Sequence, residues 1–316
     1  MILIFGSQED PHVVSVQREI ERNGYESAII DIYSKNSLGL DFFNSKNFCW
    51  SMGEKSINQT IDVIWWRLKP KNNIPSTSAD SLYDYYFQSR EWGVMLDSIE
   101  LAFSNIPWIN KRKISKAASN KIHQLSVAEK LGFEIPRTII SNNFVQILEF
   151  MDHLGHTEIL CKTITGYASP SGKVAFSSII DRKLIKEQAR SISICPAIYQ
   201  EYIVKDFELR ITIIGTEIFA VRIDGNLNEN SRIDWRKNIF SDMYSIWTIE
   251  NELKSKLLYL HNELGLIYAT YDLIVDKSGK IIFLEVNPSG QWMWLEECLN
   301  LPISTCLAKK LISLSM

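Results

Sequence analysis

The stretch from Tyr268 to Trp292 constrains the fold most, because it holds two strand-like segments around a tight turn. Residues 268–275 and 280–286 are rich in β-branched and aromatic residues, which is typical of strands. The four residues between them have turn chemistry, and Gly279 can take a positive φ. The pattern predicts a β-hairpin.

Two acids, Asp272 and Glu285, lie inside these apolar strands, where a carboxylate is costly unless something pairs with it. Asn287 is two residues after Glu285 and therefore shares its strand face. If the chain turns near residues 277–278, Asp272 lies diagonally across from Glu285, roughly 7–8 Å away at the backbone. Two carboxylates and one amide oxygen on one face suit a magnesium ion shared with substrate phosphates. The alternative is two buried acids that are satisfied by arginines or by backbone groups.

Composition excludes several classes of protein. The 316 residues suffice for two or three packed units, and a net charge of −3 lacks the basic skew of a dedicated nucleic-acid binder. The five cysteines form no C-x-x-C, which favours a reducing compartment. The start MILIFGSQED is no signal peptide, and no apolar run reaches the ~18 residues of a membrane span. We therefore expect a cytoplasmic protein with no nucleic-acid partner and no membrane partner.

Residues 1–110 are expected to form an open α/β domain. Strands and helices alternate there, which favours a mostly parallel sheet. The expected strands are 1–5, 27–32 and 62–68, and the expected helices are 10–22 and 81–103. Gly6 is not followed by G-x-G-x-x-G, so a dinucleotide site is unsupported. Arg67, beside two tryptophans at a strand end, either faces a cleft or stacks on the surface.

Two further units are expected, at 111–203 and 204–316. In the first, a helix over 115–131 carries Lys121 in its first half, and a strand over 158–162 ends on Lys162. The loop 163–172 resembles a flexible flap over phosphates but is not a P-loop of the Walker type. A segment over 181–193 has the pattern of a helix.

The last unit carries most of the remaining charged candidates. A strand over 207–214 places Glu208 and Arg210 on one face. A strand over 217–223 carries Arg222, and a charged segment after it carries Arg236. A helix over 249–264 precedes the hairpin.

Taken in order, these motifs resemble those of the ATP-grasp superfamily over about residues 110–300. They are Lys121, Lys162, the segment Q-E-Y-I, Glu208-x-Arg210, Asp272, Glu285 and Asn287. Within that superfamily, KAASNKIHQLSVAEKLGFEIPRTIISN, QEYIVKDFELRITIIG, RIDWR, FLEVNPSGQWMWLEE and the N-terminal IWWR resemble the ligases that crosslink microviridin-type peptides, the graspetide macrocyclases. The flap TGYASPSG departs from the pattern, which leaves its contacts unassigned.

The resemblance implies an α/β plus α+β fold, with an N-terminal pre-ATP-grasp domain and ATP held between two α+β subdomains. It implies that Lys121 and Lys162 hold phosphates, that Glu201, Tyr202 and Ile203 present backbone groups to adenine, and that Glu208 binds ribose. Magnesium would lie on Asp272, Glu285 and Asn287. The clamps for the substrate carboxylate and its phosphate would be Arg210, Arg222 and Arg236, since arginine matches both groups bidentately.

Three functions remain open at this point. The first is a macrocyclase that phosphorylates Asp or Glu side chains of a ribosomal precursor peptide, with a leader and a core rich in acids and Thr, Ser or Lys. It would then form ω-ester or ω-amide crosslinks and release ADP and phosphate. The second is a ligase that adds a free amino acid to a carboxylate, and the third is a non-catalytic ATP-binding module. The full set of magnesium ligands disfavours the third, and the segments DWR and QWMWLEE favour the first. A homodimer is among the oligomeric states that the sequence allows.

No Ser-His or Cys-His arrangement stands out, and the five histidines are expected to lie away from the motifs. The protein should therefore supply electrostatics and positioning, and the substrate should supply both reacting groups.

Overall fold

A computed structural model of the chain describes residues 1–32, 60–68, 82–165, 177–225 and 243–316. Between 38 and 57 it also describes the backbone of a three-stranded antiparallel sheet, formed by β3 (Leu38–Asn44), β4 (Asn47–Met52) and β5 (Lys55–Ile57). This small sheet was not predicted. Arg236, the rest of the segment 231–236 and flap residues 166–172 lie outside the described residues.

The N-terminal unit is built on a parallel sheet, as predicted. Its strand order is β2-β1-β6-β7, with β1 (Ile2–Phe5), β2 (Ser27–Ile30), β6 (Val63–Trp66) and β7 (Trp108–Ile109). Helix α1 (Pro11–Arg22) begins after Asp10, whose side chain accepts a hydrogen bond from the His12 amide. Helix α2 (Leu82–Ala102) is the second helix of this unit.

The prediction of a single helix over 115–131 is wrong. The structure has α3 (Arg112–Ala118) and α4 (Lys121–Lys130), because Asn120 takes an extended conformation and its side chain caps the His123 amide. Lys121 is consequently the first residue of α4 rather than part of a continuous helix. Likewise, the segment 181–193 forms two short helices, α6 (Arg182–Glu187) and α7 (Ala189–Ile194).

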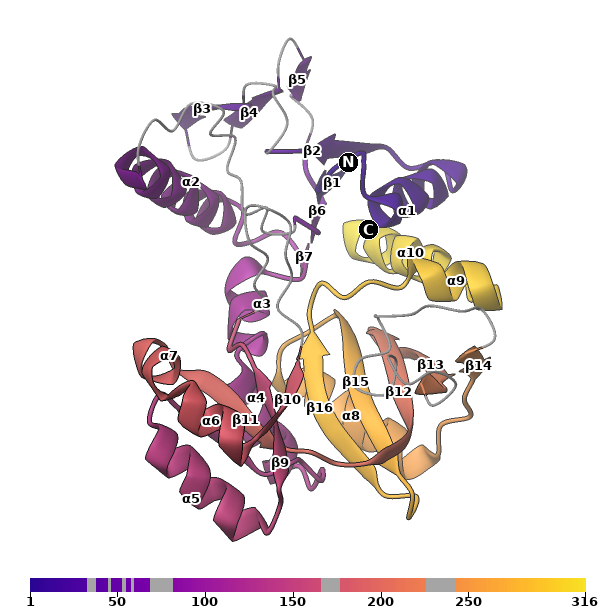
Figure 1. Cartoon of the computed structure of the whole chain (residues 1–316). Helices are drawn as coiled ribbons and strands as arrows, with labels where there is room; N and C mark the ends of the chain where they lie inside the picture. The colour runs from indigo at the N-terminus through magenta and orange to yellow at the C-terminus, as the bar shows by residue number, and fades with distance from the viewer. Residues whose placement is uncertain are drawn as a thin grey trace.

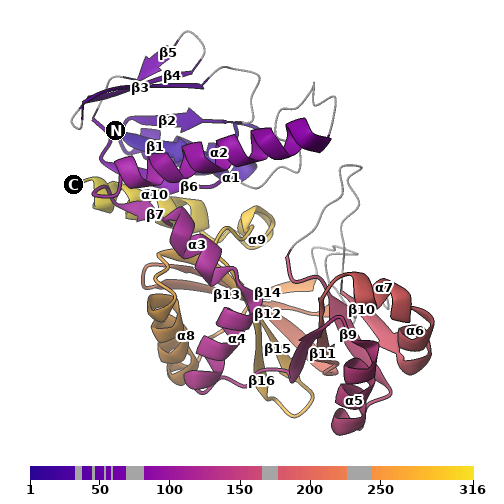
Figure 2. The same ribbon diagram turned by 90° about the vertical axis from the view of Figure 1, so that its left-hand side faces the viewer.

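The central unit is a four-stranded antiparallel sheet with helices on one face. Its order is β10-β9-β11-β8, with β8 (Thr138–Ser141), β9 (Glu158–Lys162), β10 (Ser178–Asp181) and β11 (Ala197–Glu201). Helix α5 (Phe144–Leu154) buries Ile147 and Met151 in a core that includes Tyr199. In Figure 2 these helices flank the sheet at the side away from the rest of the molecule.

The C-terminal unit is a five-stranded antiparallel sheet in the order β14-β13-β12-β15-β16. The strands are β12 (Lys205–Ile214), β13 (Glu217–Ile223), β14 (Tyr244–Ile246), β15 (Tyr268–Asp276) and β16 (Ile281–Asn287). Helix α8 (Asn251–Glu263) covers one face, where Leu257 and Leu260 pack with the apolar side chains of β12 and β15. The predicted hairpin is thus confirmed as β15 and β16.

The end of the chain returns to the beginning. Helices α9 (Met293–Leu299) and α10 (Ile303–Ser315) follow the hairpin, and α10 packs beside α1 (Figure 1). One core joins Leu307 and Leu311 of α10 to Ile4 and Val16, and it also includes Trp292. The N-terminal sheet and the C-terminal sheet therefore share a hydrophobic core.

Candidate active site

A β-bulge in the hairpin decides which side chains meet. Leu273 lies opposite Phe283, but Asp272 lies opposite Glu285, so Leu284 is the extra residue. Without the bulge Asp272 would oppose Leu284, and Glu285 would point to the other face, because side chains alternate along a strand. The predicted diagonal placement of the two acids is wrong. They are directly opposite each other and on one face.

The two acids continue a row that crosses three strands. Arg210 of β12 lies opposite Asp272, and Asp272 lies opposite Glu285. Arg210 Nη1 donates to both carboxylate oxygens of Asp272, at 2.7 Å and 2.8 Å. The neighbouring row holds Thr212, Thr270 and Asn287. The strand register thus brings Arg210 and the three predicted magnesium ligands together.

Glu285 is ionised in this arrangement. It forms an ion pair with Lys121 and accepts a hydrogen bond from Asn287 Nδ2 at 3.1 Å. Burial raises its pKa, but the charges of Lys121 and Lys162, together with these hydrogen bonds, lower the pKa to about 2. The carboxylate is therefore available to a cation at neutral pH.

Lys121 reaches Glu285 because α4 is fixed to the edge of the sheet by Gln124. The Gln124 amide accepts from the backbone N of Val286 at 3.1 Å and donates to its carbonyl at 2.8 Å, as a neighbouring strand would. Gln124 is completely buried and lies one helical turn after Lys121. Sequence reasoning missed this residue, since a lone glutamine in a helix carries no signal.

The donor set fits a magnesium ion. It offers two carboxylates and one amide, all hard oxygen donors. Among the described residues no group of three or more His, Cys, Asp or Glu side chains could hold a metal, so a site here depends on the amide of Asn287. The ion pairs with Arg210 and Lys121 also match the alternative of two structurally satisfied acids. These contacts alone are compatible with a magnesium site and with two acids that only stabilise the fold.

Lys162 faces this row from the central sheet. Its Nζ donates to Gln200 Oε1 at 2.8 Å, and Gln200 Nε2 donates to Thr138 Oγ1 at 2.8 Å. Burial lowers the pKa of Lys162, whereas the charge of Glu285 raises it. Gln200 is buried and was not predicted. Its amide orientation is fixed because the Thr138 hydroxyl already donates to the Pro136 carbonyl.

The remaining nucleotide candidates lie where β11 passes into β12. Glu208 shares a strand face with Arg210, as predicted, and forms an ion pair with Lys205 at 2.5 Å. The backbone N of Glu201 donates to the Arg137 carbonyl at 2.9 Å, so this amide is already used within the sheet. Tyr202 and Ile203 form the link between the two strands.

Arg222 is not brought to the site. It lies opposite Leu209, whereas Arg210 lies opposite Val221, so the two arginines project from opposite faces of the sheet. Its guanidinium stacks 3.9 Å from the centroid of the Phe207 ring and binds Asp224. The structure thus places Arg222, one of the three predicted clamps, apart from Arg210, and the strand register that decides this could not be read from sequence.

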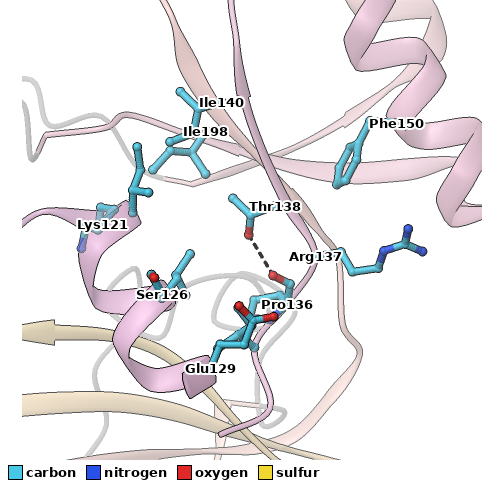
Figure 3. A pocket seen from close by; sticks show the side chains of 12 residues that line it. Lys121, Ser126, Glu129, Pro136, Arg137, Thr138, Ile140, Phe150 and Ile198 are labelled. Carbon is cyan, nitrogen blue, oxygen red and sulfur yellow. Dashed lines mark hydrogen bonds between the residues drawn. The ribbon is translucent and has the colours of Figure 1, made fainter. Parts of the chain in front are cut away.

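A cavity of about 670 Å³ adjoins Lys121 (Figure 3). Helix α4 forms one wall with Lys121, Ser126 and Glu129, and the central sheet forms another with Thr138, Ile140 and Ile198. Ile198 lies opposite Lys162, so the cavity opens on the sheet face that carries this lysine. The volume suits a small-molecule ligand.

Two expectations about the N-terminal unit need correction. Arg67 does stack on an aromatic ring, that of Trp292, but it is 1% exposed and not a surface residue. His12 does not lie away from the motifs, because its Nε2 accepts from the backbone N of Trp292 at 3.0 Å. Both contacts join segments far apart in the sequence, which no local pattern reveals.

Comparison with known proteins supports the ATP-grasp resemblance. No curated protein matches the chain. Among solved structures, a RiPP-associated ATP-grasp ligase of Chryseobacterium gregarium, in complex with ADP and a leader and core peptide, is 25% identical with a TM-score of 0.87, over 99% of this chain and 96% of that one. The macrocyclase MdnC of Microcystis aeruginosa MRC, bound with the precursor peptide MdnA, is 25% identical with a TM-score of 0.84, over 99% of both chains. The ligase PsnB, complexed with a minimal precursor, shares the fold at 20% identity, with a TM-score of 0.82 over 100% of this chain and 99% of that one.

A family model described as the RimK-like ATP-grasp domain matches residues 118–313. This span covers α4, the central and C-terminal sheets and the row of Arg210, Asp272 and Glu285. It makes up more than half of the chain. The chain therefore belongs to the family of RimK-like ATP-grasp domains.

Proposed function

We propose that the protein is an ATP-dependent, ADP-forming ligase that matures a ribosomally made precursor peptide. It phosphorylates Asp or Glu side chains of the core and joins them, as ω-esters or ω-amides, to hydroxyl or amine groups of the same peptide. One observation carries the proposal. The chain is similar over 99% of its length, N-terminal unit included, to two ligases at 25% identity whose structures hold precursor peptides.

The chemistry requires a leaving group on the acid. A carboxylate does not acylate an alcohol or an amine at neutral pH, whereas an acyl phosphate does. In the proposal the terminal phosphoryl group of ATP passes to the side-chain carboxylate, and the neighbouring nucleophile then displaces phosphate. Magnesium bound by Asp272, Glu285 and Asn287 would neutralise charge on the transferred phosphoryl group.

The chain's own residues supply cations and orientation. Lys121 and Lys162, which approach the row from two sides, are proposed to hold the nucleotide phosphates. Arg210 is proposed to bind the substrate carboxylate, because its planar guanidinium can form two parallel hydrogen bonds with a carboxylate. In the structure one nitrogen of this guanidinium, Nη1, donates to both oxygens of Asp272.

Nucleotide placement follows from the same sheet. We propose that adenine and ribose lie at the β11–β12 link, near Tyr202, Ile203 and Glu208. The proposal divides the chain at 1–110, 111–203 and 204–316, which accords with the separate apolar cores of the central and C-terminal sheets.

A cytoplasmic location is part of the proposal. ATP and a ribosomal peptide are both available there. Of the described cysteines, Cys161, Cys195, Cys298 and Cys306 are free thiols. No helix in the described part of the chain is long and apolar enough to cross a membrane.

Mass spectrometry of a precursor peptide, encoded beside the gene and incubated with the protein, ATP and magnesium, tests the function. The expected product has lost one water for each crosslink and shows ring-bounded fragmentation. A peptide that instead gains the mass of an added amino acid would identify an amino-acid ligase and contradict the proposal.

A further inference from the structure

The loop Pro288–Trp292 follows Asn287 directly and leads into α9. From residue 288 to residue 291 every carbonyl oxygen accepts a hydrogen bond from a side chain located elsewhere. Asn110 donates to the carbonyl of residue 288 at 3.2 Å, and Arg67 donates to those of residues 289 and 290 at 2.8 Å and 2.7 Å. Tyr268 also donates to the carbonyl of residue 290, at 2.6 Å, and Arg210 donates to that of residue 291 at 3.2 Å. Two of these donors, Arg67 and Asn110, come from the N-terminal unit or its boundary.

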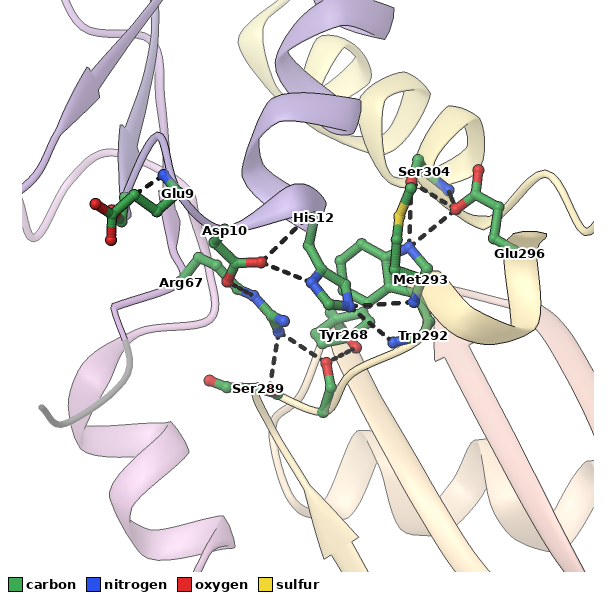
Figure 4. A network of polar contacts seen from close by, with 12 residues as sticks. Glu9, Asp10, His12, Arg67, Tyr268, Ser289, Trp292, Met293, Glu296 and Ser304 are labelled. Carbon is green, nitrogen blue, oxygen red and sulfur yellow. Dashed lines mark hydrogen bonds and ion pairs between the residues drawn. The ribbon is translucent and has the colours of Figure 1, made fainter. Parts of the chain in front are cut away.

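The far end of the loop is also fixed from the N-terminal unit. His12 Nε2 accepts from the backbone N of Trp292 and of Met293, at 3.0 Å and 3.1 Å, and so caps α9, which has no side-chain cap of its own. Because Nε2 accepts, Nδ1 carries the proton and donates to Asp10 Oδ1 at 2.6 Å. The other oxygen of Asp10 accepts from Arg67 Nε at 3.2 Å. Asp10 thus orients two of the side chains that hold the loop, His12 and Arg67 (Figure 4).

Close packing leaves the loop little freedom. A Cβ on Gly290 would lie 1.7 Å from Thr270 Oγ1, so the backbone rests directly on β15. Thr270 lies opposite Asn287 in the hairpin. Arg67 is 1% exposed, and its guanidinium lies 5.0 Å from the centroid of the buried Trp292 ring. A displacement of Arg67 would therefore be transmitted to the backbone beside Asn287.

We propose that Arg67, oriented by Asp10, is a positioning residue for the magnesium and carboxylate end of the site. It holds Ser289 and Gly290, which places Asn287 on one side and the Gln291 carbonyl, a partner of Arg210, on the other. The inference rests on the proposed function for the roles of Asn287 and Arg210. Arg67 acts through the loop and touches neither nucleotide nor peptide.

The test is Arg67→Lys, which keeps the charge but replaces the planar fork, whose Nε binds Asp10 and whose Nη1 binds the two carbonyls, by one ammonium nitrogen on a flexible stem. Arg112→Lys is the matched control. Arg112 also binds an aspartate, Asp97 at 2.6 Å, and also lies 5.0 Å from a tryptophan centroid, that of Trp66, but it does not hold the loop.

All measurements use the full chain. The rate of ADP formation gives kcat and the magnesium concentration for half-maximal activity, and calorimetry gives the affinity of a non-hydrolysable ATP analogue with and without magnesium. Thermal melting gives stability, and deuterium exchange is followed at amides 289–293, since Pro288 has no amide hydrogen. For Arg67→Lys we expect magnesium binding weaker by about tenfold and kcat lower by about tenfold or more, since small displacements in a site can cost about 100-fold. Exchange in the loop should be faster, and affinity for the metal-free analogue should stay within twofold. Arg112→Lys should match the wild type throughout.

An Arg67→Lys protein with a lower melting temperature but with wild-type magnesium affinity and kcat would overturn the proposal. Arg67 would then only stabilise the contact between the N-terminal and C-terminal units. If Arg67→Lys does not fold, Asp10→Asn, which removes the charge that orients Arg67, is measured against the same outcomes. If the wild type crosslinks no peptide, the proposed function fails, but magnesium affinity and loop exchange still decide the role of Arg67.

Discussion

Variants of the Arg210–Asp272 ion pair distinguish whether the row of Arg210, Asp272 and Glu285 serves catalysis or only stabilises the fold. The two side chains are 9% and 20% exposed, and both Asp272 oxygens are bonded. Removing one partner of a buried pair costs roughly 3–5 kcal/mol, since the other charge is left uncompensated. Because one-fifth of Asp272 reaches water, we expect Asp272→Leu to lower the free energy of unfolding by about 3 kcal/mol.

The double variant Arg210→Met with Asp272→Leu removes both charges. Replacement of a buried ion pair by apolar side chains of similar volume is often close to neutral, so its free energy of unfolding should return to within about 1 kcal/mol of the wild type. Its ADP formation should nevertheless remain at least ~100-fold below the wild type, because the metal ligand and the carboxylate clamp are both gone.

Urea unfolding followed by circular dichroism gives the stabilities, and coupled ADP detection gives turnover. A double variant that is stable and also active would refute the reasoning, because the row would then serve only the fold. A single Asp272→Leu variant as stable as the wild type would show that the pair is not buried as the structure has it.

Three further predictions concern the nucleotide, the helix that carries Lys121, and pH. Lys121→Ala and Lys162→Ala should each raise the KM for ATP by roughly tenfold or more, since a hydrogen bond to a charged group contributes about 1.5–3 kcal/mol. If calorimetry shows unchanged ATP affinity in both variants, the two lysines have a structural role only. Gln124→Met should lower the free energy of unfolding by about 2 kcal/mol, because it leaves the backbone groups of Val286 unpaired, whereas a surface change such as Lys130→Met should leave it within about 0.5 kcal/mol. Burial lowers the pKa of His261 from 6.5 to about 4, so the unfolded state binds more protons between these values and stability falls as pH drops through this window. Between about pH 8 and about pH 5, His261 should lower the free energy of unfolding by about 2 kcal/mol, and this loss should vanish in His261→Gln. An unchanged dependence of stability on pH in that variant would contradict the assignment.

The local sequence pattern was sufficient to predict the hairpin. The β-branched runs and the Asp276–Gly279 turn define β15 and β16 to within a residue or two, and Gly279 has a φ of 85° as the turn requires. Alternation along one strand also placed Glu208 and Arg210 on a common face. Both inferences use only neighbours in sequence.

Register between strands was not readable in this way. The bulge after Asp272 rests on a single extra residue, Leu284, that the composition of the strand does not mark. The position of Arg222 depends on pairing between β12 and β13, and a shift of one residue would have reversed its face.

Contacts between distant segments were equally hidden. Gln124, Gln200 and Arg67 each bond a group at least 38 residues away in the chain. A glutamine or an arginine can satisfy its donors in water, so its type alone does not predict burial. Such residues orient the charged side chains that the motifs identify.

The most direct test of the central claim is trapping of the activated side chain. The protein, ATP, magnesium and the precursor peptide are incubated with hydroxylamine, and the peptide and nucleotide products are analysed by mass spectrometry and chromatography. The account predicts a hydroxamate on an Asp or Glu side chain of the core and stoichiometric ADP, both lost in Glu285→Gln. Accumulation of AMP and pyrophosphate would mean adenylation of the carboxylate and would contradict an acyl-phosphate mechanism.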